Sequence, residues 1–536
     1  MAEVETSSGV AAARQEVWQP RANPWLIAVV VAMAAFMEVL DGSIANVALP
    51  HLAGDLGASN DESTWVLTSY LVSNAIVLPI SGWLAGLFGR KRLFLLCILV
   101  FTTSSLLCGA APSLAMLILF RVIQGTGGGG LQPMAQAILA DSFPPQKRGL
   151  AFALYGITAI LAPTIGPTVG GWITDNYSWR WIFYINLPVG VLALFLVSRL
   201  VEDPPYVKRA RTGGVRVDYV GIGLLTLGVS ALQVVLDKGQ EEDWFGSHVI
   251  VLLALTAAIC LVSLVIWEWF QPAPIIEVRL FTNVNFAVAN LMIFVLGVLM
   301  FSSLVMVPQF LQTLMGYTAE NAGLVLSASG LVLLCEMPIV GQLTTRVPAK
   351  YLIAFGWLAL AAGMYYSTSR IDLLISFSSA AWLRVAQSLG LGFLFVPISL
   401  AGYVGISPEK SNSIAGLLNF MRNMGSSVGT SMMTTMLARR AQFHQSMMTY
   451  RTTSYDPAFL DQIRGLSQQL VHSGSSAADA QIQASRRVYL SLQAQAQTLA
   501  YVDTFMVLAV GAGLMFLLAF AVRTNDPSAG GEVAAG

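Results

Sequence analysis

The strongest constraint on this chain is a succession of fourteen apolar stretches, each long enough to form a helix that crosses a bilayer. Such a helix needs about 20 mostly apolar residues to traverse roughly 30 Å of hydrocarbon. Hydrophobic residues make up 55% of the 536 residues and charged residues only 11%, too few to cover a water-exposed surface. The sequence therefore predicts an all-α polytopic membrane protein, with spans at 25–48, 63–84, 93–111, 114–137, 149–172, 181–200, 218–237, 248–268, 285–311, 322–344, 350–368, 372–399, 411–436 and 500–522.

The placement of Lys and Arg predicts the orientation of these spans. With the N-terminus in the cytoplasm, seventeen basic residues fall in cytoplasmic segments and only three in short loops on the other side. Cytoplasmic loops of membrane proteins carry this excess. An even number of spans then places both termini in the cytoplasm. The 29 basic and 29 acidic residues cancel, so no overall field attracts nucleic acid.

An internal repeat indicates two related halves. Two sets of residues recur with the same internal offsets, one set after 259 residues and the other after 263. Two independent matches of this kind are hard to produce by chance in apolar sequence, and paired halves around a central site are the plan of alternating-access transporters. The repeated sets are Pro79, Gly82, Leu84 and Lys91 with Pro338, Gly341, Leu343 and Lys350, and Arg121, Gln124, Gly127 and Gly129 with Arg384, Gln387, Gly390 and Gly392.

The repeat and the loops together predict the domain organisation. Two six-helix bundles flank two additional helices, and the one long loop lies before the last span. That loop is rich in Gln, Ser and Ala, and we expect short amphipathic helices on the outer face, either as a solvated connector or as a docking surface. The predicted segments are a tail at 1–24, a bundle at 25–200, a linker at 201–217, two helices at 218–270, a bundle at 271–523 with a periplasmic loop at 437–499, and a tail at 524–536.

Ionisable residues deep in the spans are the main candidates for function, because each costs at least about 2.5–3.5 kcal/mol at the centre of a membrane. At 1.5 Å per residue, Asp41 in the first span and Arg121 in the fourth both lie roughly 12 Å below the outer surface. Glu38 lies one turn deeper than Asp41 on much the same face. Three further charges, Glu336, Arg384 and Arg422, lie deep in later spans.

Two carboxylates beside one arginine form a candidate proton switch, because burial and a neighbouring positive charge act on a carboxylate in opposite directions. We therefore predict a proton-coupling role for Asp41, Arg121 and Glu38. The alternative for each is a static buried ion pair that fixes helix packing. For Glu336, Arg384 and Arg422 the packing interpretation is favoured.

Other classes of function are disfavoured by what the chain lacks. The run Gly127–Gly130 has no following Gly-Lys-Ser/Thr, so it indicates close helix packing rather than a phosphate site. The four cysteines and four histidines show no metal-ligand spacing, and no nucleophile–base pair is evident. We expect no enzyme activity, no metal and no cofactor. A passive channel would not need a buried carboxylate–arginine pair.

Several motifs resemble those of the fourteen-span drug:proton antiporters of the major facilitator superfamily, the EmrB/QacA-like multidrug exporters. The segment from Leu40 to Pro50 is similar to the first-span signature of that group. The fourth-span motif tied to proton transfer is matched by Arg121, Gln124 and Gly125, and the fifth-span antiporter motif by Gly166, Pro167, Gly170 and Gly171. The pair Arg422-Asn423 also resembles the group. A loop motif is matched by Gly82, Gly89, Arg90 and Arg92.

One departure from the family pattern concerns this loop motif. Gly86 stands where the superfamily usually has aspartate, which puts in doubt the cytoplasmic gate assigned to that acid.

The resemblance implies efflux of hydrophobic or amphipathic compounds across the bacterial inner membrane, driven by the proton gradient without a cofactor. In Gram-negative relatives it also implies a periplasmic adaptor and an outer-membrane channel as partners. The alternative on the same fold is a dedicated exporter of one metabolite, siderophore or lipid.

Overall fold

A computed structural model describes residues 20–204, 217–451 and 456–522. The predicted C-terminal tail and most of the predicted N-terminal tail and linker lie outside these residues. Regular structure in the described part is entirely helical. The helices are α1 (Pro24–Leu56), α2 (Asn60–Phe88), α3 (Arg90–Gly109), α4 (Leu114–Ser142), α5 (Pro145–Asn176), α6 (Trp181–Tyr184), α7 (Asn186–Leu200), α8 (Tyr219–Lys238), α9 (His248–Phe270), α10 (Val284–Thr313), α11 (Ala319–Leu343), α12 (Ala349–Arg370), α13 (Phe377–Ser388), α14 (Leu391–Ala401), α15 (Ser411–Arg451), α16 (Pro457–His472) and α17 (Ala477–Leu518), with 3-10 turns η1 (Trp244–Gly246), η2 (Val278–Thr282), η3 (Pro408–Lys410) and η4 (Ala519–Ala521).

Each of the fourteen predicted spans falls on helix. Two of them are broken, the sixth between α6 and α7 and the twelfth between α13 and α14. Twelve helical segments among the described residues are long and apolar enough to cross a membrane, which confirms the multi-pass membrane protein. The more polar α12 and α15 are not among them, so fourteen crossings stays a prediction.

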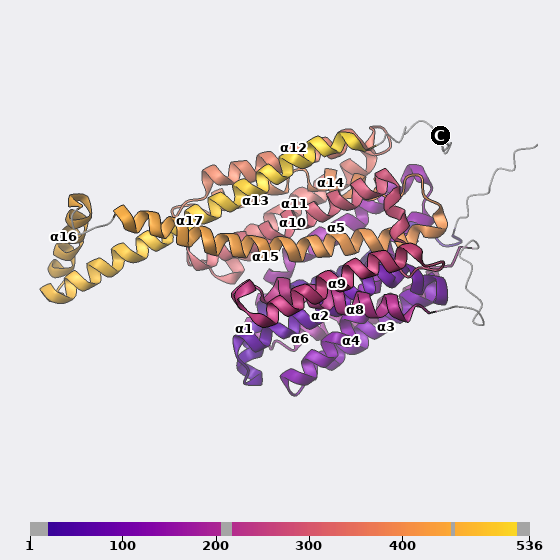
Figure 1. Cartoon of the computed structure of the whole chain (residues 1–536), viewed down its shortest axis with the longest axis horizontal. Coiled ribbons are helices and arrows are strands. Elements are labelled where there is room, and N and C mark those ends of the chain that lie inside the picture. The colour runs from indigo at the N-terminus through magenta and orange to yellow at the C-terminus, as the bar shows by residue number, and fades with distance from the viewer. Residues whose placement is uncertain (1–19, 205–216, 452–455, 523–536) are drawn as a thin grey trace, which may run out of the picture.

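The helices form two groups that lie side by side (Figure 1). We call α1–α7 the N-terminal group, and α10–α15 with α17 the C-terminal group. The groups meet where α5 packs along α11 and where α2 and α4 pack on α15. Of the additional pair α8–α9, α8 covers the α2–α15 seam and α9 packs on α8. There Gln233 of α8 donates to Ser427 Oγ at 2.9 Å, and Lys238 donates to Thr64 Oγ1 of α2 at 2.7 Å.

The glycine run of α4 explains how three helices of the N-terminal group approach so closely. A Cβ on Gly127 would lie 2.7 Å from the backbone of Phe101 in α3, and one on Gly129 would lie 2.6 Å from the carbonyl of Asn74 in α2. Side chains at these positions would push both neighbours away. The run therefore packs helices, as the sequence predicts.

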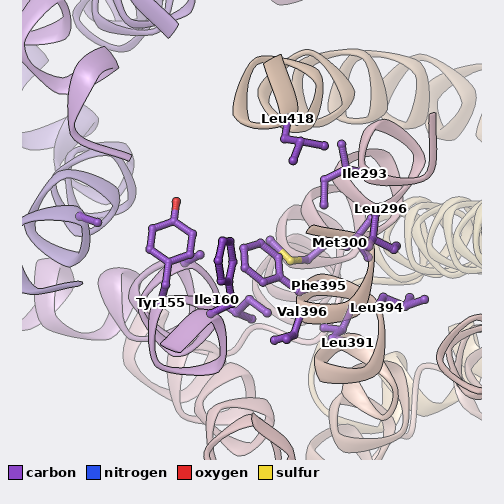
Figure 2. Packing of buried hydrophobic residues seen from close by; sticks show 14 of the residues in the cluster. Tyr155, Ile160, Ile293, Leu296, Met300, Leu391, Leu394, Phe395, Val396 and Leu418 are labelled. Carbon is purple, nitrogen blue, oxygen red and sulfur yellow. The ribbon is translucent and has the colours of Figure 1, made fainter. Parts of the chain in front are cut away.

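Hydrophobic packing continues from one group to the other. Figure 2 shows Tyr155 of α5 beside Phe395 of α14, with the tyrosine hydroxyl pointing away from the apolar cluster. The two rings are stacked, with centroids 6.0 Å apart. Buried residues of α10, including Ile293, Leu296 and Met300, complete this cluster.

The segment predicted as a long loop at 437–499 is helical over most of its described residues. Helix α15 continues to Arg451 and α17 begins at Ala477, so both flanks extend the adjoining spans, and only α16 is a short helix. We call described residues 437–451 and 456–499 the hairpin; it projects from one end of the bundle (Figure 1). Its tip is held by a small cluster of Leu470, Ala480 and Ala484. Polar composition alone does not reveal that a helix continues beyond the bilayer.

Candidate functional site

A buried polar site of the N-terminal group is built around Asp41 of α1. Arg121 of α4 donates from Nη1 to Asp41 Oδ2 at 2.6 Å, and the two side chains are 0% and 1% exposed. The other carboxylate oxygen, Oδ1, accepts from Gln124 Nε2 at 3.0 Å and from Asn186 Nδ2 at 2.7 Å. The ionised carboxylate thus has three side-chain donors.

Local backbone geometry brings Asn186 to this site. The sixth span breaks at Ile185 and restarts as α7 at Asn186. Pro188, two residues later, lacks a backbone N–H and cannot bond to the carbonyl of Tyr184, which explains the break. Asn186 also donates to Ser105 Oγ of α3 at 3.0 Å, which fixes its amide.

Arg121 is held by more than its carboxylate. Its Nε donates to the carbonyl of Val66 at 3.1 Å and its Nη1 to Gln124 Oε1 at 2.8 Å. The guanidinium carbon lies 4.1 Å from the centroid of the Tyr70 ring and 5.6 Å from that of Phe183. Aromatic faces stabilise a buried cation.

Glu38 belongs to a different set of contacts, so the expectation of two carboxylates beside one arginine is wrong. Its Oε1 accepts from Tyr70 Oη at 3.0 Å and from Asn74 Nδ2 at 2.9 Å, and its Oε2 accepts from Gln132 Nε2 at 2.5 Å. The positive charge on this side is Arg422 of α15, which donates to the carbonyl oxygen of the same Gln132 side chain. Neighbouring turns of α1 therefore face separate arginines.

Helix α5 contacts α1 next to both acids. A Cβ on Gly166 would overlap the Ser43 side chain, and one on Gly170 would lie 3.1 Å from the carbonyl of Ile44. Pro167 has no backbone N–H for the carbonyl of Pro163, and Ser43 Oγ donates to that carbonyl at 3.1 Å instead. Gly171 is less tightly packed, because its nearest neighbour would be Val47 at 3.8 Å.

The loop motif lies at the end of the bundle opposite the hairpin. Gly89 has a φ of 82° and joins α2 to α3, which a residue with a side chain would do only under strain. Arg90 forms a buried ion pair with Asp141 of α4, and its Nη2 lies 3.5 Å from the carbonyl of Pro408 near α15. Arg92 is exposed.

Two glycines of the same region differ in their surroundings. A Cβ on Gly82 would lie 2.8 Å from the Cα of Ser413, so this glycine sets the distance between α2 and α15. Gly86 has open space around it. The buried acid beside Arg90 is therefore supplied by Asp141, and not from the position where the family usually has aspartate. Gly125 packs against the Ser73 side chain of α2.

Glu336 has contacts that suit a packing role. It accepts from the backbone N–H groups of Gly390 at 3.0 Å and Gly392 at 3.1 Å. It thereby caps the break between α13 and α14, where Gly390 has a φ of 99°.

Arg384 is the counterpart of Arg121 in the C-terminal group, but its surroundings differ. It is 2% exposed and donates to Ser303 Oγ at 2.7 Å and to Gln387 Oε1 at 3.2 Å. No carboxylate forms an ion pair with it in the described part of the chain. Ser303 lies 262 residues after Asp41, close to the 259 and 263 that separate the repeated motifs. The C-terminal group thus carries an acid-free copy of the Asp41 site.

Apart from Gln124, sequence reasoning missed the neutral amides of these sites. Asn186, Asn74 and Gln132 carry no charge, so the search for buried ionisable groups passes over them. The proline after Asn186 and the position of Gln132 eleven residues after Arg121 in the same span were the available signals.

Known proteins resemble this chain in sequence and in fold. The family model described as Major Facilitator Superfamily matches residues 31–430. The multidrug export protein EmrB of Haemophilus influenzae is 37% identical over 92% of this chain and 95% of its own length. The fatty acid resistance protein FarB of Neisseria gonorrhoeae is 36% identical over 83% and 87%. The proton:xylose symporter XylE superposes with a TM-score of 0.61 at 15% identity, covering 94% of this chain and 97% of that chain, which supports the fold alone.

Proposed function

Since the chain belongs to the major facilitator superfamily, and within it to the EmrB-like drug exporters, we propose that it exports amphipathic drugs and toxic compounds in exchange for protons. The observation that carries the proton part is the buried Asp41–Arg121 pair. No cofactor is required, because the proton gradient supplies the driving force.

The proposed coupling uses the two states of Asp41. Ionised, the carboxylate holds Arg121, Gln124 and Asn186 through the hydrogen bonds described above. A proton on Asp41 removes the charge that attracts the guanidinium, and one of the three donors must give way. The tight α1–α5 contact at Ser43 and Ile44 directly follows Asp41 in α1, so a shift of the carboxylate reaches the helix that packs on α11.

The proposed location is the bacterial inner membrane, with both termini in the cytoplasm. The end of the bundle opposite the hairpin carries Arg90, Lys91, Lys147 and Lys350, as cytoplasmic loops do. In this orientation the hairpin is periplasmic.

A periplasmic adaptor protein, joined to an outer-membrane channel, is the proposed partner. The hairpin exposes large apolar side chains, among them Tyr450 at 83%, Ile482 at 68% and Tyr489 at 53%. Exposed apolar side chains mark a protein contact where they gather into one patch, and the proposal assigns these side chains to such a patch. This placement fits an adaptor that receives substrate beyond the membrane.

The test is transport in everted membrane vesicles that acidify their lumen. The proposal predicts uptake of an amphipathic dye that a protonophore abolishes. Uptake that persists without a gradient would contradict it. A panel of dyes, biocides and uncouplers, with fatty acids added because of the FarB relative, separates a multidrug exporter from an exporter of one metabolite, siderophore or lipid.

A further inference from the structure

We propose that Glu38 is the acid of a second, proton-dependent lock, in which the Gln132 side chain links the charge of Glu38 in the N-terminal group to Arg422 in the C-terminal group. The inference rests on the proposed proton exchange and assigns a separate task to the acid that does not contact Arg121. Its basis is the contact set that joins α1, α4 and α15 in the middle of the protein.

The orientation of the Gln132 amide follows from its neighbours. An ionised carboxylate only accepts hydrogen bonds and a guanidinium only donates them. The amide therefore directs Nε2 to Glu38 Oε2 and its carbonyl oxygen to Arg422. Glu38 and Arg422 form no direct ion pair among the described residues, and the Gln132 amide bridges them by hydrogen bonds. All three side chains are buried, at 4%, 4% and 6% exposure.

The surrounding contacts belong to the same boundary between the groups. Asn419 of α15 donates to Gln136 Oε1 of α4 at 2.7 Å, and Asn423 donates to Asn74 Oδ1 of α2 at 3.3 Å. The Tyr155 hydroxyl lies 3.2 Å from Gln132 Oε1 and 3.3 Å from Asn419 Oδ1. Among these contacts, only the Arg422–Gln132–Glu38 chain joins charged groups.

The side chains that face Glu38 are hydrogen-bond donors and one cation, so their interactions depend on whether Glu38 is ionised. Tyr70 and Asn74 of α2 and Gln132 of α4 all donate to it, Arg422 of α15 is the cation, and Tyr155 of α5 lies behind Gln132. Asp41 is one turn away on α1, and Arg121 lies behind the Tyr70 ring. A proton on Glu38 meets three donors and leaves Arg422 as a buried cation without a countercharge. Separation of α15 from α4 then gives Arg422 access to water.

The position of the lock indicates which opening it controls. Gln132 lies ten residues before the end of α4 at Ser142, and Arg422 lies eleven residues after the start of α15 at Ser411. Both are therefore about 15 Å from the end opposite the hairpin. Ionised Glu38 holds that end closed, and protonated Glu38 favours its opening. An exporter that binds its substrate from the cytoplasm while releasing a proton requires this order.

The experiment measures the distance between spin labels at Gln146→Cys and Glu409→Cys in the full chain, with the four native cysteines replaced. Both positions are exposed and lie at the end opposite the hairpin, one in α5 and one in η3. In the otherwise unchanged protein, lowering the pH should increase the long-distance population. Glu38→Gln should show the low-pH distribution at every pH, and Arg422→Gln should lose most of the pH response.

Two controls separate this lock from general loosening and from the Asp41 site. Asn419→Ala removes uncharged contacts between α15 and α4, so it should leave the pH response in place even where it widens the distribution. Asp41→Asn should abolish proton-driven transport but keep the pH-dependent distance change. A wild-type pH response in Glu38→Gln would overturn the lock while leaving the proposed export intact. Absence of proton-driven transport in the unmodified protein would instead refute the proposed function.

Discussion

Asn186 donates a 2.7 Å hydrogen bond to Oδ1 of Asp41 from the first residue of α7. Because the break in the sixth span fixes this donor, the span serves the site and does not merely fill the bundle. Asn186→Leu should remove one of three side-chain donors to the carboxylate. A hydrogen bond to a charged group contributes about 1.5–3 kcal/mol. We expect proton-driven export to fall by at least about tenfold, measured as initial dye uptake in vesicles. Asn176→Ala, which removes an exposed amide of α5 away from Asp41, should retain normal uptake.

The glycines of α5 provide a second prediction with a matched control. Gly170→Ala places a Cβ 3.1 Å from the carbonyl of Ile44 and forces α1 and α5 apart. Such overpacking costs about 1–3 kcal/mol. Both the thermal unfolding temperature and the transport rate should therefore fall. Gly171→Ala meets only Val47 at 3.8 Å and should be close to wild type in both measurements. Equal effects of the two substitutions would show that close packing of α5 on α1 is not the cause of the lower unfolding temperature and transport rate.

Arg384 lacks the carboxylate that its counterpart Arg121 has, which predicts a stabilising substitution. Ser303→Asp should pair with the guanidinium that now donates to Ser303 Oγ at 2.7 Å. We expect the free energy of unfolding to rise by about 1–3 kcal/mol. Ser302→Asp is the control, because the Ser302 hydroxyl donates to the carbonyl of Val298 in its own helix and not to a group of another helix. An aspartate there should destabilise the protein. Destabilisation by Ser303→Asp as well would exclude an available positive charge at Arg384.

The hairpin is predicted to serve a partner and not the transport cycle. Residues 445–495 can be replaced by a short Gly/Ser linker, which removes the tip but keeps Arg440, His444 and Asp503, whose contacts join α15 to α17. Transport in vesicles should persist, and drug resistance of a double-membrane cell should fall. Unchanged resistance would make the hairpin a connector. Loss of transport in a folded variant would place it within the cycle.

The sequence was sufficient to predict that Asp41 and Arg121 lie at the same depth, because axial position follows from 1.5 Å per residue along a helix. It was not sufficient to predict the partner of Glu38. Glu38 and Asp41 are three residues apart, so their side chains leave the helix in directions that differ by about 60°. A single sequence does not show which neighbouring helix each side chain faces. Arg422 reaches Glu38 through the neutral Gln132, a link that no pattern of charges reveals.

The lengths of the helices could also be predicted only in part. Apolar length predicted the position of each helix of the bundle, because a bilayer requires about 20 apolar residues per crossing. Beyond the bilayer this requirement disappears. The polar end of the helix Ser411–Arg451 and the polar start of the helix Ala477–Leu518 are therefore predicted as one loop between two spans. Beyond the bilayer the two helices contact each other; for example, Gln445 Nε2 donates to Tyr489 Oη at 3.1 Å.

The central claim is that Asp41 carries the exchanged proton, and its most direct test is Asp41→Asn in reconstituted vesicles. The asparagine keeps the size of the side chain but cannot become an anion. The variant should still exchange labelled for unlabelled substrate across the membrane, but an imposed proton gradient should no longer drive accumulation. Gradient-driven accumulation by Asp41→Asn at a rate comparable to wild type would show that Asp41 does not carry the exchanged proton.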